Sequence, residues 1–158
     1  MIILLKGFRN ITPFGGAHVF SGRQRNNIAG RNQAMDFNCS IETTSASTAR
    51  LSVSDTIRYP TQPADSVVTG TAWVTGVRQS DGECSSFKID FTSQRIGTAD
   101  PVLKANVTTV LYDGLALPTD PTMSTTTTGI YRVQVVGLAA TNIAWDARIV
   151  AQQIVYTP

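Results

Sequence analysis

The sequence has few of the residues that build exposed helices and metal centres. Among 158 residues there are three Lys and two Glu, too few for the Glu–Lys pairs that stabilise surface helices. It has one His and two Cys, Cys39 and Cys84, whereas a zinc site needs three or four clustered ligands. We therefore expect a chain with little helix, no metal and no cofactor.

The residues that catalysis requires are also scarce. Acyl transfer needs a nucleophile beside a base, usually His. The single His18 lies in an aperiodic, Gly-containing stretch, where we interpret it as a surface or contact residue. Glycosidases need two opposed carboxylates, but many acids here are single Asp residues at turns, such as Asp81 and Asp113. The sequence predicts a protein that is not an enzyme.

Long apolar runs are missing as well. Residues 1–5 are apolar but far shorter than the roughly 18 residues that a spanning helix needs. They have no basic region before them and no cleavage site after them, so we do not expect them to form a signal peptide. We expect no membrane contact and no export. The two Cys are expected to be reduced thiols without a disulfide between them, Cys39 facing inward and Cys84 outward.

Thr and Ser are abundant, with 21 and 12 residues. Thr, like Val and Ile, is β-branched and packs well on a pleated sheet. Apolar residues alternate with polar ones over several segments, and turn signals such as Asp81-Gly82 recur every 8–12 residues. The sequence therefore predicts an all-β, antiparallel β-sandwich or jelly-roll-like body of about eight strands.

The alternation also predicts which residues face the core. Trp145 has the parity of Ile143 and Ile149, so we place it in the core rather than on a binding surface. The predicted inward series are Phe37, Cys39, Ile41 and Thr43; Leu51 and Val53; Phe87, Ile89 and Phe91; Leu103, Ala105, Val107, Thr109 and Leu111; Tyr131, Val133 and Val135; and Ile143, Trp145, Ala147 and Ile149.

Charge divides the chain in two. Residues 1–35 carry five basic residues and no acid, whereas residues 36–158 carry eight basic residues and eleven acids. We predict an extended basic docking arm, 1–35, joined to a β-sandwich body, 36–158. Five charges are a weak form of a nucleic-acid-binding pattern, so we expect an acidic protein partner and no nucleic acid. The predicted partner-binding residues of the arm are Ile2, Leu4, Lys6, Phe8, Arg9, Phe14, Arg23, Arg25 and Arg31.

The C-terminal part of the sequence has a recognisable arrangement. Residues 131–150 combine an alternating strand, a turn at Gly137 and a second strand that carries Trp145. Residues 30–33, with the turn at Thr43-Thr44, and residues 70–78 add an opening and a middle strand. This pattern resembles a β-sandwich module of tailed-bacteriophage virion proteins, found in the terminal domains of tail fibres and spikes and in capsid decoration proteins.

The resemblance implies a structural protein of the virion, made in the host cytoplasm. We expect a capsid decoration (cement) protein, a homotrimer that binds the major capsid protein or other virion subunits and stabilises the head shell. The alternative is a tail-fibre or receptor-binding module that contacts a host surface glycan. Fibre proteins usually carry a long stalk before this module, whereas about 30 residues precede it here, which favours a small stand-alone virion subunit.

Overall fold

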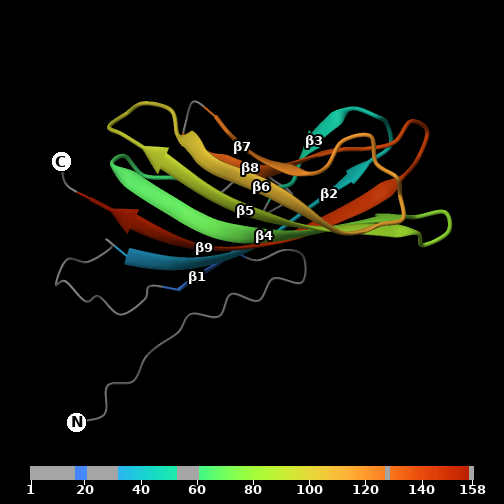
Figure 1. The fold of residues 1–158 in the computed structure, drawn as a ribbon, viewed down its shortest axis with the longest axis horizontal. Coiled ribbons are helices and arrows are strands. Elements are labelled where there is room, and N and C mark those ends of the chain that lie inside the picture. Colours follow the sequence, from blue (N-terminus) through green and yellow to red (C-terminus); the bar gives the residue numbers. More distant parts are fainter. Residues whose placement is uncertain (1–16, 21–31, 53–60, 127–128, 157–158) are drawn as a thin grey trace, which may run out of the picture.

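A computed structural model of the chain describes residues 17–20, 32–52, 61–126 and 129–156, and these residues form strands and no helix (Figure 1). The strands of this described part are β1 (Ala17–Phe20), β2 (Asn32–Thr43), β3 (Thr48–Arg50), β4 (Ser66–Arg78), β5 (Cys84–Arg95), β6 (Val102–Asp113), β7 (Thr122–Thr125), β8 (Tyr131–Val136) and β9 (Ile143–Val155).

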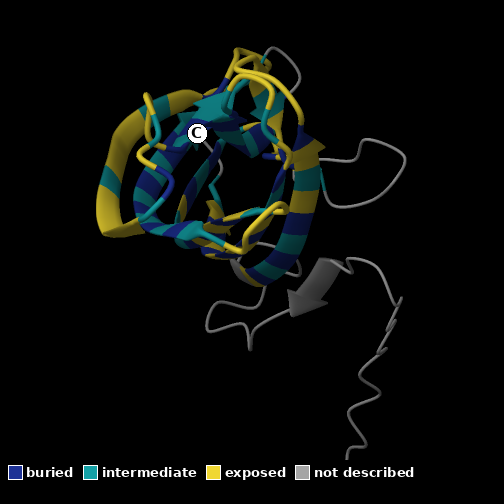
Figure 2. Cartoon of the chain, turned by 90° about the vertical axis from the view of Figure 1, so that its right-hand side faces the viewer, coloured by how far each residue is buried: buried dark blue, intermediate teal, exposed yellow. Residues whose placement is uncertain are grey.

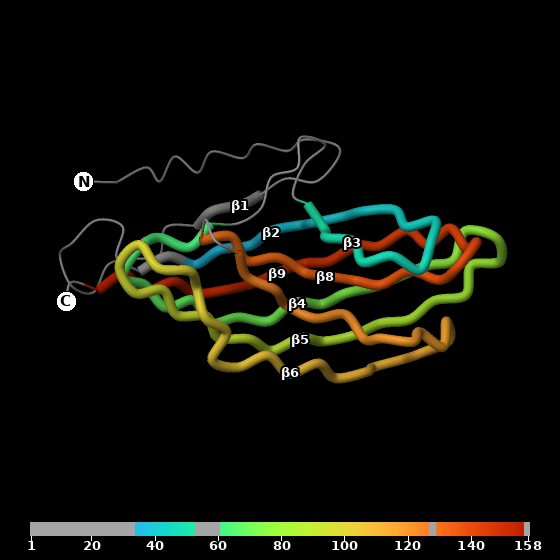
Figure 3. Tube along the Cα trace, turned by 90° about the horizontal axis from the view of Figure 1, so that it is seen from above, coloured from blue at the N-terminus to red at the C-terminus, as the bar shows by residue number. Residues whose placement is uncertain are grey.

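The strands form two antiparallel sheets that pack against each other. The larger sheet has the order β1-β2-β9-β4-β5-β6, and the smaller has the order β3-β8-β7. Seen from above, the smaller sheet lies over the larger one, whose edge strands are β1 and β6 (Figure 3). The predicted all-β antiparallel sandwich is therefore confirmed.

The core lies between the two sheets and follows the period of two that strands impose. Along β5 and β9, buried side chains alternate with partly exposed ones, which Figure 2 shows as alternating bands. Tyr131 of the small sheet is buried against the larger sheet, with its ring centroid 5.9 Å from that of Phe91 and 6.5 Å from that of Phe37. The predicted inward series of β2, β5, β8 and β9 are confirmed.

Trp145 is part of this core, as its parity predicted. Its side chain is 2% exposed, and its indole Nε1 donates a hydrogen bond of 3.0 Å to Thr43 Oγ1 on the adjacent strand. Gly76 lies under the indole, where a Cβ atom would come within 3 Å of ring carbons. The glycine therefore leaves the space that the largest core side chain occupies.

The β4–β5 connection confirms the predicted turn. Gly82 has a φ of +77°, a conformation that glycine adopts without steric cost. The Nε–H of Arg78 donates to both carboxylate oxygens of Asp81, at 2.8 and 2.9 Å, and this pairing spans the turn. The fixed turn sets the register in which β4 and β5 pair along their full length.

Strand β6 corrects the sequence analysis. Its residues 103, 105, 107, 109 and 111 were expected to face inward, yet only Leu103 packs against the core. The β5–β6 pairing has register irregularities at Ser86/Phe87 and Thr92/Ser93, so odd-numbered residues do not keep to one face. Leu103 pairs with inward Ser93, whereas Val107 pairs with Asp90 on the outer face.

Two described elements extend into the segment predicted as an arm. β1 pairs with β2 over Ala17–Phe20, and β2 itself begins at Asn32. Strand β1 therefore forms one edge of the large sheet. The division of the chain at residue 36 remains a prediction.

Candidate interaction surface

The residues predicted to bind a partner lie outside the described part of the chain. All nine belong to residues 1–16 or 21–31: Ile2, Leu4, Lys6, Phe8, Arg9, Phe14, Arg23, Arg25 and Arg31. Their role in docking therefore remains a prediction. The described residues instead present a different surface, on β6 and on the adjoining outer face of the large sheet.

Strand β6 exposes apolar side chains on both of its faces. Val107 and Tyr112 lie on the outer face and are 59% and 54% exposed, and Val110 on the opposite face is 46% exposed. Val102 and Leu111 are also more than half exposed. In Figure 2, β6 is almost entirely yellow, whereas the other long strands of the sheet alternate in colour. Such a contiguous exposed apolar surface is typical of an interaction site.

The inner face of β6 is tied to the small sheet through polar side chains. The amide of Asn106 donates to the Met123 carbonyl at 3.0 Å and accepts from the Met123 N–H at 3.2 Å, as a neighbouring strand backbone would. Thr108 Oγ1 donates to the Pro121 carbonyl at 2.7 Å. These bonds hold β6 against β7, so β6 is a fixed part of the sandwich and its free edge has a defined orientation.

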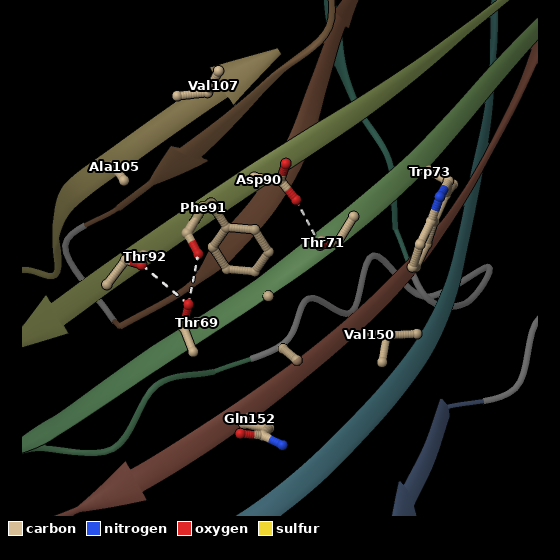
Figure 4. Close-up of a pocket in the computed structure, with 12 residues that line it drawn as sticks. Thr69, Thr71, Trp73, Asp90, Phe91, Thr92, Ala105, Val107, Val150 and Gln152 are labelled. Atoms are coloured by element: carbon tan, nitrogen blue, oxygen red, sulfur yellow. Dashed lines mark hydrogen bonds between the residues drawn. The ribbon is translucent and has the colours of Figure 1, made fainter. Parts of the chain in front are cut away.

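A hollow of about 410 Å³ lies on the outer face beside β6. Trp73, 44% exposed, stands at one end of it, and Val107 and Val150 are on its sides (Figure 4). Gly70 and Ala151 belong to its floor, where β4 and β9 approach closely. Because Val107 belongs to both features, the hollow and the exposed β6 form one continuous surface.

Polar side chains around the hollow pair with each other across strands. Asp90 accepts a hydrogen bond from Thr71 Oγ1 at 2.7 Å and forms an ion pair with Lys88 at 2.8 Å. The Lys88 ammonium, and then the Thr71 hydroxyl, hold the pKa of the Asp90 carboxyl below its usual value. Thr69 and Thr92 face each other with their hydroxyl oxygens 3.1 Å apart. The rim is therefore polar and ordered around an apolar centre.

The two cysteines lie in different environments. Cys39 is 2% exposed on the inner face of β2, and burial, with a smaller contribution from the Asp146 charge, raises the pKa of its thiol to about 12. Cys84 begins β5 and is half-buried opposite Val77. Both are free thiols. Cys39 is therefore a core residue and not a nucleophile.

The described ranges contain no cluster of three or more His, Cys, Asp or Glu residues with the geometry of a metal site. They also contain no helix that could cross a membrane.

The exposed surface was missed by the sequence analysis, although one signal for it exists. Trp73 has the parity of Thr69, Thr71 and Thr75, and the opposite parity to Val68, Ala72 and Val74, which are buried. A large aromatic residue in a Thr series predicts an exposed aromatic on the outer face of the sheet. No comparable signal exists in β6, because its sequence alternates as a half-buried strand does.

Comparisons with known proteins give little support for any function. No protein-family model matches the sequence, and no curated protein matches it. Among solved structures, the chain is similar to the crystal structure of the Acinetobacter phage vB_ApiP_P1 tailspike protein, with 17% identity and a TM-score of 0.34. The alignment covers 81% of this chain and 23% of that chain. A similarity at this level carries no argument about function.

Proposed function

We propose that this chain is a structural protein of a bacteriophage virion that acts by binding other subunits, without catalysis. The observation that carries the proposal is the continuous apolar surface over β6 and the Trp73 hollow. The same chain buries its core thoroughly, with Phe87 and Ile89 fully inaccessible, yet leaves Val107 and Leu111 more than half exposed. A partner that covers this surface would bury its apolar area, and this burial would contribute most of the binding free energy.

The first specific role that we propose is capsid decoration, in which the protein binds the major capsid protein and stabilises the head shell. The sequence pattern of virion modules supports it, as does the concentration of five positive charges and no acid in residues 1–35. Opposite charge on a shell would speed encounter and fix orientation. The apolar surface would then hold the subunit in place.

The test is binding of the full-length protein to purified heads that lack it. We expect Val107→Lys to reduce occupancy more than about tenfold, because a charge would be buried against the shell. Ile154→Lys is the matched control, since Ile154 is 53% exposed on the same sheet but lies at the far end of β9. Arg23→Ser/Arg25→Ser/Arg31→Ser should weaken attachment and reduce its salt dependence. Equal occupancy for wild type and both sets of variants would contradict the proposal.

A second role, a tail-fibre or receptor-binding module, is favoured by one observation. The exposed indole of Trp73 borders a hollow whose rim carries hydroxyl and carboxylate groups, an arrangement that suits a sugar ring of a host glycan (Figure 4). Trp73→Ala should then abolish binding to host cells while leaving thermal stability close to wild type. If the variant binds cells normally but no longer binds heads, the tail role is excluded.

A further inference from the structure

The free edge of β6 lacks most of the devices that usually protect an edge strand, and its two register irregularities leave residues 105–110 as a regular stretch between them. β6 is 12 residues long and, within the part of the chain that the structure describes, is hydrogen-bonded to β5 on one side only, since it ends the order of its sheet. Edge strands are usually short, charged or interrupted by proline. β6 contains no proline, and its only charged residues are Lys104 and Asp113. The regular stretch of residues 105–110 is open, uncharged and rich in β-branched residues, and such an edge is a template for another strand.

The two charges stand near opposite ends of the strand. Between them lie the uncharged residues Ala105 to Tyr112, which include Val107, Thr108, Thr109 and Val110. When two copies of β6 run antiparallel, the Lys104 end of each copy meets the Asp113 end of the other. The edge is thus complementary in charge to itself, and its β-branched centre faces an identical centre.

We propose that β6 pairs antiparallel with β6 of a second copy of this chain about a two-fold axis. Such an interface is isologous, because the same residues are used by both copies. It joins the large sheets of the two copies, six strands each, into one continuous sheet. The inference does not rest on the virion role and goes beyond it.

The faces of β6 define which residues lie close to the axis. In an antiparallel pair, opposite side chains point to the same face, so a residue on the axis faces its own copy. Thr109 and Val107 are outer-face residues, paired with Lys88 and Asp90 of β5. Both lie near the middle of the strand, and we place the axis at one of them, where that residue is within reach of its counterpart in the other copy.

Disulfide trapping tests this geometry in the full-length protein. Val107→Cys and Thr109→Cys would be made in a Cys84→Ser background, with Cys39 retained because it is buried. A disulfide needs Cα atoms within about 7 Å, so we expect at least one of the two to give covalent dimers on mild oxidation. Ile154→Cys in the same background is the matched exposed control and should stay uncrosslinked. Failure of both β6 variants to crosslink would overturn the proposal.

Sedimentation equilibrium tests the stoichiometry. The wild type should reach twice the chain mass of 17.0 kDa. Val107→Lys/Val110→Lys places a charge on each face of the strand centre and should raise the dimer dissociation constant more than about tenfold. Ile96→Lys/Ile154→Lys changes equally exposed residues outside β6 and should leave the dimer intact. Circular dichroism would establish that the variants are folded.

Three results would overturn self-pairing through β6. One is a wild type that is monomeric at all concentrations. Another is a trimer, the state predicted from the sequence, that persists in Val107→Lys/Val110→Lys. The third is a monomer that binds phage heads through Val107, which would assign the edge to a different virion subunit while leaving the virion role intact.

Discussion

Strands β5 and β6 are hydrogen-bonded neighbours of equal length, 12 residues each, and their surroundings differ completely. In β5 every second residue from Ser85 to Ser93 is buried, and Phe87 is inaccessible. In β6 none of the 12 residues is buried, and Val110, which pairs directly with Phe87, is 46% exposed. Both strands carry apolar and polar residues in alternation.

The difference comes from what covers each strand. β5 lies between β4 and β6 and faces the small sheet, whereas β6 has no further strand beside it among the described residues and faces the short β7. Asn106 and Thr108 join β6 to Met123 of β7 and to the preceding Pro121 through polar groups. Apart from Leu103, the apolar residues of β6 therefore do not pack in the core of this fold, and we attribute them to association.

The largest expected effect is the difference between the losses of stability caused by truncating Phe87 and by truncating its cross-strand partner Val110. Phe87→Ala removes a fully buried ring and leaves a cavity, so we expect the free energy of unfolding to fall by about 3–5 kcal/mol. The measurement is urea unfolding under conditions that keep the protein monomeric. Val110→Ala is the matched substitution in β6. A loss of more than about 2 kcal/mol in Val110→Ala would show that β6 belongs to the core after all.

Alkaline pH should destabilise the interior, because Cys39 and Tyr131 are buried and burial raises the pKa of both. The pKa of Cys39 is about 12 in the fold against an ordinary value of 9.0. The stability that the neutral thiol contributes is complete below pH 9 and is lost as pH rises toward 12, by at most about 4 kcal/mol. Urea midpoints between pH 8 and 11 should fall less steeply in Cys39→Ala than in Cys84→Ser. An equal fall of the urea midpoint with pH in the two variants would show that ionisation of Cys39 does not cause the loss of stability.

Gly76→Ala should cost about 1–3 kcal/mol, because the added methyl group meets the ring of Trp145. Thr75→Ala, one residue away on the exposed outer face of β4, is the control and should change stability by less than about 0.5 kcal/mol. Thermal unfolding of the two variants measures the contrast. Near-equal melting temperatures would mean that the Trp145 ring moves aside without cost.

The smallest effect is expected at the tip of the β6 surface. Leu111→Ala should change the stability of the monomer by less than about 0.5 kcal/mol, since Leu111 is 56% exposed. It should nevertheless weaken association in the sedimentation assay, because it removes apolar area from the surface. A variant that loses stability without any change in association would assign Leu111 a purely structural role.

The fold was predictable to the extent that one face of each strand is covered. Trp145, Phe87 and Tyr131 were placed in the core by parity alone, because sheet geometry forces alternate residues onto one face. The exposure of β6 was not predictable in this way. It depends on strand order and on two register irregularities, which are set by tertiary packing.

One part of the candidate site could also be predicted from the sequence and another part could not. Trp73 had a local signal, its parity within a Thr series, whereas the open edge of β6 appears only once the sheet is assembled. The predicted partner-binding residues of the arm lie outside the described residues, and their role remains a prediction. An interaction surface formed by several strands can thus be identified only from the structure, whereas core residues can be predicted from the alternation of apolar and polar residues.

The central claim, that the free edge of β6 is a binding surface, is tested most directly by amide hydrogen exchange measured residue by residue at low and high protein concentration. In the monomer, β6 amides that point away from β5 should exchange rapidly. Strand β5 has a hydrogen-bonded neighbour on each side, so its amides should exchange slowly. We predict that the outward β6 amides become as protected as those of β5 when concentration rises. Outward β6 amides that exchange rapidly at every concentration would contradict self-association through this edge.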